Sequence, residues 1–347
     1  MGFSGNRRDH TRSAESELTH PYTRLTPEQV IAAVESTGRY SDARILALNS
    51  YENRVYQVGI EDDSPLIVKF YRPERWSREQ IDEEHRFTAY LYQHEIPVVP
   101  PITIDGAAQY PTLGSYDGFL FAIYPRQGGR APELDNLDHL HQLGRFIGQI
   151  HRLGEGFPFR YRHALSVEQS SANVACLLDD GFIPAELEPA YRAVTAEILA
   201  AIDERRPDDP RYSQISLHGD CHAGNVLWRD ERPHFVDFDD AITGPAMQDL
   251  WMLLSGDIAG QQRQLLEIVE GYETFREFDR GELRLIEPLR AMRVLHFNAW
   301  LARRWDDPAF PMAFPWFDTP RYWSDYILEL KELLSALQLE PITMPDI

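Results

Sequence analysis

The segment that most constrains this chain is LHGDCHAGNVLW, residues 217–228, followed after a turn by FVDFDD at residues 235–240. It places one carboxylate at Asp220, an amide five residues later at Asn225, and a second carboxylate at Asp237, after an apolar strand-like run. Carboxylate and amide oxygens are the hard ligands that Mg²⁺ binds in proteins. The fold of this chain must therefore bring a loop and the end of a strand together around one polar site.

This order of acid, amide and acid is typical of kinases, which transfer a phosphoryl group from ATP to a hydroxyl. Asp220 would accept or orient the hydroxyl proton, and Asn225 and Asp237 would bind Mg²⁺, with Asp237 also serving catalysis. Gly219 stands where protein kinases have an arginine, and Asp239 stands where they have the glycine of Asp-Phe-Gly. We therefore predict a phosphotransferase that uses ATP and Mg²⁺.

A lysine in an apolar strand indicates a second part of this machinery. Lys69 lies in LIVKF, residues 66–70, and burying an unpaired ammonium is costly. The phosphates of ATP would supply a partner, and a glutamate on the following helix would hold the lysine, as in kinases. Glu84 is our candidate and Glu83 is the rival. Taken alone, Lys69 would be an edge-strand lysine that faces water.

The turn NSYEN, residues 49–53, lies between two predicted strands, where a kinase has the loop that covers the phosphates. It contains no glycine, so the usual glycine-rich pattern is absent. Ser50 and backbone N–H groups could still contact a phosphate. An ordinary hairpin turn explains the segment equally well.

Zinc chemistry is the first alternative for the motif region. His218, Cys221 and His222 could be imagined as ligands, but the adjacent Cys221 and His222 cannot easily converge on one ion. The sequence offers no second ligand pair. We expect His218 to structure the loop by hydrogen bonding and Cys221 to be a buried, neutral thiol.

Phosphatase chemistry is the second alternative. Asp237 and Asp239 after a strand resemble the Asp-x-Asp of aspartyl-phosphate enzymes, in which the first acid is the nucleophile. That class expects threonine or valine two places after the second acid, where this chain has Ala241. It would also leave Asp220 and Asn225 without a role.

Composition limits the partners and the compartment. The chain has 347 residues, of which 43% are hydrophobic, and a formal net charge of −21, so we expect a folded protein that repels nucleic acid and anionic membranes. Only two cysteines occur, Cys176 and Cys221, which suits a reducing compartment. There is no apolar run of the ~20 residues needed to span a bilayer, and the N-terminus does not resemble a signal peptide. A cytoplasmic location follows as the expectation, with a monomer as the default.

The pattern of apolar residues predicts an α+β protein with a bilobal, protein-kinase-like fold. A flexible tail (1–20) would precede an N-lobe (21–125) with a small antiparallel sheet and one helix. A hinge (126–130) would lead to a large, mostly helical C-lobe (131–347). Strands are expected at 45–48, 54–58, 66–70 and 119–124, and helices at 28–35, 78–94, 137–153, 184–204, 248–271, 280–304 and 322–337.

The motifs resemble those of the aminoglycoside phosphotransferase and choline kinase superfamily. The similarity lies in HGDCHAGN at 218–225 and FVDFDD at 235–240. In that superfamily an asparagine precedes the second strand, as Asn53 does here. A glutamate also stands twelve residues before an Ile-Pro-Val, as Glu84 stands before the IPV of residues 96–98.

Further segments are similar to the bacterial stress response kinase A family, over roughly residues 22 to 340. They are LNSYENRVYQ (48–57), VKFYRPERW (68–76), IEPLRAMR (286–293), AWLARRW (299–305) and FPW (314–316). The resemblance implies a cytoplasmic serine/threonine protein kinase that uses ATP and Mg²⁺, can autophosphorylate and acts in a stress response.

By the same resemblance Asp220 would be the proton acceptor, and Asn225 and Asp237 would be the Mg²⁺ ligands. Ser50 and Asn53 would join Lys69 and Glu84 in binding the nucleotide. The residues alone do not identify the acceptor, so a kinase of small alcohols such as aminoglycosides, choline or homoserine remains the alternative. A non-catalytic ATP-binding scaffold is a third reading.

Overall fold

The computed structural model describes residues 20–106 and 109–344. They form two compact units, each built from separate stretches of chain. The larger unit combines Pro27–Ser166, Arg206–Leu289 and the described residues 340–344, and the smaller unit combines Val167–Arg205, Arg290–Leu339 and residues 20–26. These limits differ from a division at residues 126–130, and the lobe boundaries stay a prediction. Apart from His20, the predicted tail lies outside the described residues.

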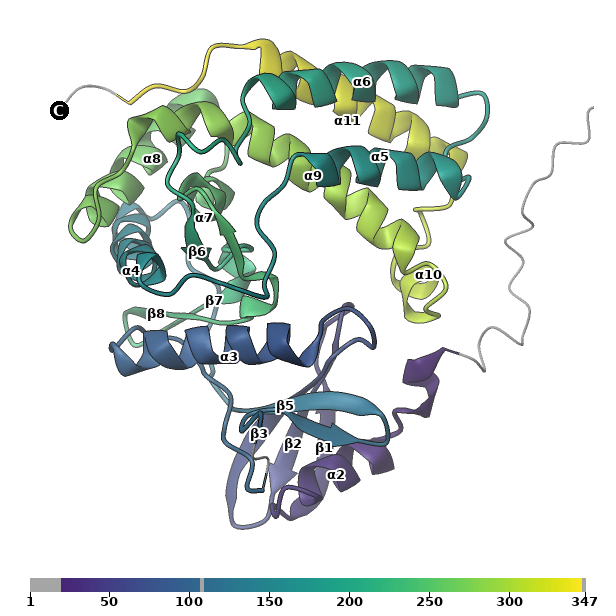
Figure 1. The fold of residues 1–347 in the computed structure, drawn as a ribbon, viewed down its shortest axis with the longest axis vertical. Coiled ribbons are helices and arrows are strands. Elements are labelled where there is room, and N and C mark those ends of the chain that lie inside the picture. Colours follow the sequence, from purple (N-terminus) through teal and green to yellow (C-terminus); the bar gives the residue numbers. More distant parts are fainter. Residues whose placement is uncertain (1–19, 107–108, 345–347) are drawn as a thin grey trace, which may run out of the picture. The chain divides into compact units, whose positions relative to one another are not determined.

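The larger unit contains the helix α2 (Pro27–Glu35) and a five-stranded antiparallel sheet in the order β1-β2-β3-β5-β4 (Figure 1). In chain order the strands span Ser41–Ala47, Arg54–Ile60, Asp63–Phe70, Gly114–Tyr116 and Phe119–Pro125. β3 is an interior strand, and Lys69 pairs with Val55 on one side and Ala122 on the other. Lys69 is only 8% exposed, so the reading as a water-facing edge lysine is wrong.

The helix α3 (Arg78–Gln93) forms where the sequence predicts it. Ser77 accepts a hydrogen bond from the backbone of Gln80, and the Gln80 side chain accepts one from the backbone of Ser77. This capping box satisfies two of the backbone donors that a helix leaves open at its start. The apolar face of α3 is buried, with Phe87 and Leu91 in the main core.

Two short antiparallel pairs hold the motif region. β6 (Ile215–Leu217) pairs with β9 (Ile242–Gly244), and β7 (Val226–Arg229) pairs with β8 (Arg232–Phe235). The segment 218–225 therefore runs from β6 to β7, and the segment 236–241 runs from β8 to β9. Because both segments are anchored at each end by paired strands, their polar side chains start from fixed backbone positions.

The helix α4 (Leu137–Glu155) packs along α8 (Ile258–Glu273) by unusually close backbone contact. A Cβ atom on Gly144 would overlap the carbonyl oxygen of Ile268, and one on Gly271 would overlap that of His141. Glycine is thus required at these positions for the two helices to approach.

The expected helix over residues 248–271 is interrupted. A short helix, α7 (Met247–Leu250), passes into the 3-10 turn η4 (Trp251–Leu253), and α8 begins only after Asp257. Asp257 accepts a hydrogen bond from the backbone of Gly260, as an N-cap does. The apolar pattern alone favoured one continuous helix, but the N-cap at Asp257 starts a new helix there.

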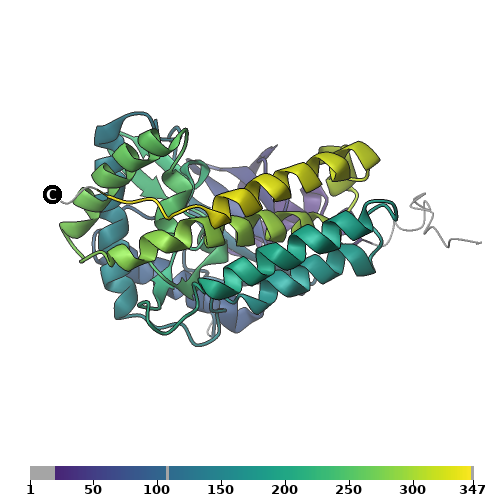
Figure 2. The same cartoon turned by 90° about the horizontal axis from the view of Figure 1, so that it is seen from above.

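The smaller unit consists mainly of helices (Figure 2). They are α5 (Glu168–Asp179), α6 (Glu188–Glu204), most of α9 (Ile286–Arg303), α10 (Ala309–Ala313) and α11 (Pro320–Gln338). α6 packs along α11, where the Tyr191 and Tyr326 rings lie 6.4 Å apart. The sequence did not predict α5 or α10, and the expected helix over 280–304 begins with a separate 3-10 turn, η5 (Arg280–Leu285).

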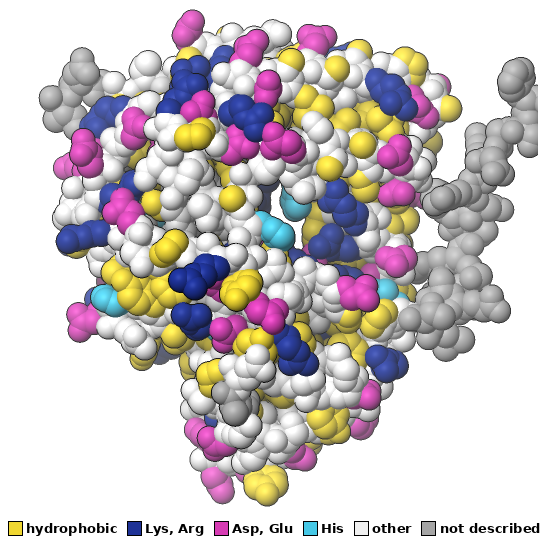
Figure 3. Space-filling view, viewed as in Figure 1, with side chains coloured by type: hydrophobic (Ala, Val, Ile, Leu, Met, Phe, Trp, Pro, Cys, Tyr) yellow, Lys and Arg dark blue, Asp and Glu magenta, His cyan; other side chains and the backbone are white. Residues whose placement is uncertain are grey.

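Acidic and basic side chains are interspersed on the face of the molecule drawn in Figure 3. Among the described residues, ion pairs join Arg276 with Glu155 and Arg280 with Glu273. Within residues 20–106 and 109–344, none of the helices combines the length and the apolar character needed to cross a membrane.

The contact between α4 and α8 gives a stability prediction. We expect Gly144→Ala to lower the free energy of unfolding by about 1–3 kcal/mol, because the added methyl group meets a backbone carbonyl that cannot move aside. Gly156→Ala, at the end of α4, is the control, since its Cβ would meet atoms only at 3.5 and 3.6 Å. Urea denaturation of both variants measures the difference, and equal stabilities would contradict the prediction.

Candidate active site

The site centres on the ammonium group of Lys69, which reaches the segment after β8. Its Nζ lies 2.7 Å from Asp237 Oδ1 and 3.5 Å from Asp239 Oδ1. Burial alone would lower the pKa of Lys69, but the two carboxylates outweigh this and raise its pKa well above the ordinary value. Lys69 is therefore a fixed positive charge that joins the sheet to residues 236–241, which contain the predicted metal ligand Asp237.

Asp239 is the most heavily bonded of the three acids in this segment. Its Oδ2 accepts hydrogen bonds from Asn53 Nδ2 at 2.7 Å and from Arg75 Nη1 at 2.8 Å. Burial disfavours the charge, yet Lys69 and Arg75 hold the pKa of Asp239 well below its usual range. Asn53 also accepts a hydrogen bond from the backbone of Arg72. Asn53 therefore connects the start of β2 to Asp239 in the segment that follows β8.

The predicted ion pair between Lys69 and Glu84 is not formed. Among the described residues, the carboxylates within ion-pairing distance of Lys69 Nζ are those of Asp237 and Asp239. Both candidate glutamates are buried, but Glu84 is the one whose charge acts on Lys69. The rival, Glu83, accepts backbone hydrogen bonds from residues 160–162 instead.

Glu84 is a buried carboxyl beside a chain of neutral polar groups. Burial raises the pKa of Glu84 to about 7, against the opposing effect of Lys69. Its neighbour His85 bonds Tyr71 at 2.7 Å and Thr112 at 2.8 Å, and burial lowers the pKa of His85 to about 3. Tyr71 and Tyr124 in turn lie 3.1 Å apart at their hydroxyl oxygens. Below pH 7 this region therefore stays largely uncharged behind Lys69.

The backbone of the predicted catalytic loop is held by one buried carboxylate. Asp249 on α7 accepts hydrogen bonds from the N–H groups of His218 at 2.9 Å and Gly219 at 2.8 Å. Gly219 has a φ of 86°, and a Cβ there would overlap the carbonyl oxygen of Asp240. Glycine is required at this turn, which explains why an arginine does not stand before Asp220.

Asp220 is partly exposed, and its carboxylate is oriented by two neighbours. Asn225 Nδ2 donates to the Asp220 backbone oxygen at 2.9 Å and to its Oδ2 at 3.3 Å. His222 Nε2 lies 3.4 Å from the same Oδ2. Because His222 Nδ1 accepts a hydrogen bond from Gly224, a neutral His222 carries its proton on Nε2, toward Asp220.

The structural roles expected for His218 and Cys221 are confirmed. His218 Nε2 bonds the carbonyl oxygen of Val236 at 3.0 Å, and its Nδ1 accepts the N–H of Asp220 at 3.3 Å. Cys221 is 1% exposed, and burial raises the pKa of its thiol well above the ordinary value. His218 thus fixes the spacing of the two polar segments, and a buried thiol of this kind is unreactive.

The donor set of Asn225 and Asp237 fits a divalent cation with oxygen ligands. Asp237 has a φ of 62° and a ψ of 63°, a left-handed conformation that costs of order 1 kcal/mol or more outside glycine. Its side chain is 50% exposed. Asn225 donates its amide N–H to Asp220, and no described residue donates to Asn225 Oδ1. One carboxylate and one amide oxygen are therefore open to a hard cation, which takes waters as its remaining ligands.

Several residues of the site have no sequence signal that spacing could reveal. Arg75 bonds Asp239 and Asp240 across 164 and 165 residues of chain, and Arg162 donates to the carbonyl oxygens of Asp239 and Ala241 across 77 and 79. Ser50, which was predicted, is half-buried in the turn between β1 and β2. A phosphate contact by Ser50 stays a prediction.

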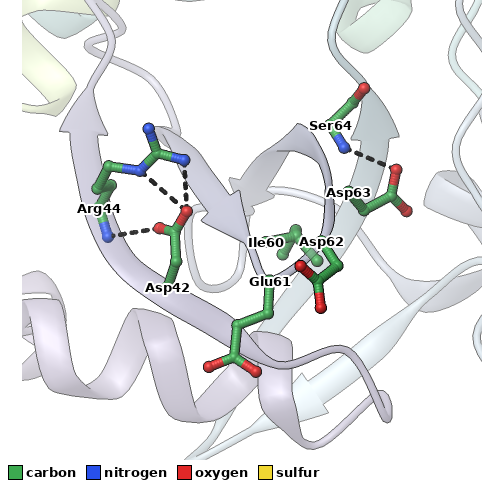
Figure 4. Close-up of a pocket in the computed structure, with 7 residues that line it drawn as sticks. All are labelled: Asp42, Arg44, Ile60, Glu61, Asp62, Asp63 and Ser64. Atoms are coloured by element: carbon green, nitrogen blue, oxygen red, sulfur yellow. Dashed lines mark hydrogen bonds and ion pairs between the residues drawn. The ribbon is translucent and has the colours of Figure 1, made fainter.

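A separate hollow lies at another part of the sheet, around the turn between β2 and β3 (Figure 4). Asp42 is paired there with Arg44, and the remaining carboxylates are those of Glu61, Asp62 and Asp63. None of the predicted site residues lines it. Its excess of negative charge disfavours the phosphates of a nucleotide.

The raised pKa of Glu84 predicts a pH-dependent stability. The carboxyl holds its proton more tightly in the folded chain, so its contribution is present below the usual pKa of 4.5 and is lost as the pH rises through 7. We expect Glu84→Gln to be more stable than the wild type at pH 8 by on the order of 2 kcal/mol, and about equal at pH 4.

Urea denaturation between pH 4 and pH 8 measures this difference. Glu282, whose pKa burial also raises to about 7, is present in both proteins, so its contribution cancels. A Glu84→Gln protein that is less stable by the same amount at both ends of the range would contradict the prediction.

Comparison with known proteins identifies the family of this chain. Residues 44–286 match the family model described as "Phosphotransferase enzyme family". The chain is 45% identical to stress response kinase A of Escherichia coli (strain K12), over 92% of this chain and 96% of the relative. It is 44% identical to the serine/threonine protein kinase RdoA of Salmonella typhimurium, with the same coverage.

Solved structures show the same fold at low sequence identity. An amicoumacin kinase in complex with AMP-PNP, Ca²⁺ and Ami superposes with a TM-score of 0.70 at 19% identity, covering 92% of this chain and 96% of that one. A spectinomycin phosphotransferase superposes with a TM-score of 0.62 at 15% identity, covering 90% and 98%. The predicted kinase-like α+β fold is confirmed. The chain belongs to the phosphotransferase enzyme family, and within it to the group of relatives named stress response kinase A.

Proposed function

We propose that this protein is an ATP- and Mg²⁺-dependent kinase that phosphorylates serine or threonine hydroxyls of proteins and also phosphorylates itself. The observation that carries the proposal is the junction of Lys69 with Asp237 and Asp239, which places a phosphate-binding charge beside a predicted metal ligand. Asp220 and Asn225 stand together on the neighbouring loop. A non-catalytic scaffold would not require this set of five residues.

Each residue has a role in this proposal. Asp220 accepts or orients the proton of the acceptor hydroxyl, and Asn225 and His222 fix the orientation of its carboxylate. Asn225 and Asp237 would hold Mg²⁺, which neutralises phosphate charge when bound. Lys69 binds the phosphates. Ser50, Asn53 and Glu84 belong to the nucleotide side of the site. Asn53 bonds Asp239 beside Lys69, and Glu84 acts on the charge of Lys69 from α3.

The names of similar proteins support a protein as the acceptor. One of them, 44% identical over most of the chain, is named a serine/threonine protein kinase, and others are named stress response kinases. We extend these names to a role in a cytoplasmic stress response, without nucleic acid or membrane as a partner. The amicoumacin kinase in complex with AMP-PNP and Ca²⁺ supports the use of ATP and a divalent cation.

A small alcohol is the alternative acceptor, and one structural observation favours it. β9 starts five residues after Asp237 and pairs at once with β6. This leaves no segment comparable to the activation loop with which protein kinases bind and regulate peptide substrates. The structural neighbours named above act on amicoumacin and spectinomycin.

The proposal predicts loss of phosphoryl transfer in two variants that keep their fold. We expect Asp220→Asn and Asp237→Asn each to reduce transfer by about 100-fold or more, because each loses a group placed at the reacting atoms. The assay follows γ-labelled ATP with Mg²⁺, with the protein alone, with casein and with myelin basic protein. Circular dichroism and the unfolding midpoint verify that both variants are folded.

The outcomes separate the acceptors. Label on the enzyme or an added protein, lost in the variants, would support a protein kinase. Label on choline, homoserine or an aminoglycoside alone would assign a small-molecule kinase. Full activity of folded Asp220→Asn would refute the assigned role of Asp220, and Mg²⁺-dependent binding of ATP without transfer to any acceptor would support the scaffold.

A further inference from the structure

Residues 237–241, here called the metal loop, are held by two arginines that lie far apart in the sequence, Arg75 and Arg162. Arg75, before α3, uses Nη1 to bond Asp239 Oδ2 at 2.8 Å and Nη2 to bond Asp240 Oδ1 at 2.5 Å. Arg162, far beyond α3, uses Nε to bond the carbonyl oxygen of Ala241 at 2.9 Å and Nη2 to bond that of Asp239. One arginine therefore binds side chains of the loop, and the other binds its backbone.

Both guanidinium groups stack on the same indole ring. The Cζ atom of Arg75 lies 5.1 Å from the centroid of Trp76, and that of Arg162 lies 4.0 Å from it. Arg162 is only 6% exposed. A planar guanidinium on an aromatic face is restrained in position while its N–H groups stay available to acceptors. Trp76 thus determines where both arginines can lie.

The backbone of Arg162 is fixed independently by Glu83. The Glu83 carboxylate accepts the N–H groups of Arg160 at 2.7 Å, Tyr161 at 2.7 Å and Arg162 at 2.8 Å. Glu83 lies within α3 and is buried. The base of the Arg162 side chain is therefore attached to the helix that follows Trp76, and its tip is attached to Trp76 and the metal loop.

We propose that Trp76, Arg75 and Arg162 form a clamp that positions Asp237 for metal binding. Asp237 has a left-handed backbone conformation, which persists only where its surroundings impose it. The clamp fixes the loop immediately after Asp237, while Lys69 bonds its carboxylate. The clamp residues do not touch the reacting atoms and act through Asp237. The kinetic side of this inference rests on the proposed function.

The test compares Trp76→Leu and Arg162→Met with two matched proteins. Trp76→Phe keeps an aromatic face for stacking. Arg160→Met removes a neighbouring arginine whose side chain is exposed and whose backbone N–H remains with Glu83. The readouts are the affinity for Mn²⁺ with a non-hydrolysable ATP analogue, the hydrogen exchange of amides 238–243, and the Mg²⁺ concentration for half-maximal transfer at saturating ATP.

We expect Trp76→Leu and Arg162→Met to weaken metal affinity about 10- to 100-fold, as loss of groups that orient metal ligands does. Amide exchange in the metal loop should rise, and kcat at saturating Mg²⁺ should change less than the half-maximal Mg²⁺ concentration. Trp76→Phe and Arg160→Met should stay near the wild type. Wild-type metal affinity and exchange in folded Trp76→Leu and Arg162→Met would overturn the clamp, as would an equal effect of Arg160→Met.

Metal affinity and amide exchange do not depend on phosphoryl transfer. A wild-type protein that transfers no phosphate to any acceptor would therefore refute the proposed function while these two readouts still decide the clamp.

Discussion

The arrangement of the site depends on one buried positive charge. Lys69 stands on an interior strand, where an ammonium without partners would be costly. Asp237 and Asp239 satisfy it from a segment 168 and 170 residues away, which brings the segment that follows β8 to the Lys69 end of β3. Asn53 and Arg75 bond the same Asp239. Because the buried ammonium of Lys69 needs carboxylate partners, it brings the nucleotide side and the metal side of the site together.

Asp239 in place of a glycine accounts for the absence of the expected ion pair with Glu84. A glycine at this position would leave Lys69 with Asp237 and with the helix glutamate. The additional carboxylate, held ionised by Lys69 and Arg75, takes the second place beside the ammonium. Glu84 is then buried without that partner, and burial raises its pKa to about 7. The substitution therefore changes both the pairing of Lys69 and the charge state behind it.

Local patterns predicted much of the fold and of the site from the sequence. The apolar strand around Lys69 and the cap at Ser77 depend on neighbours within a few residues, and both elements form as expected. The same holds for Asp220 and Asn225, which lie on one short loop. The partners of Lys69 could not be predicted, because two acids of the metal loop and Glu84 competed for it and only packing decides among them. Arg162 has no local signal, since its contacts cross 77 residues.

The charges of the site also explain how an acidic chain can accept a polyphosphate. In the proposed function, Lys69 must contact a phosphate, yet in this structure two carboxylates already neutralise it. ATP alone would meet a balanced or negative site, in a protein with a formal net charge of −21. A divalent cation on Asp237 would offset that carboxylate and leave Lys69 shared between Asp239 and the phosphates. Metal and nucleotide binding should therefore be coupled, because each supplies the charge that the other requires.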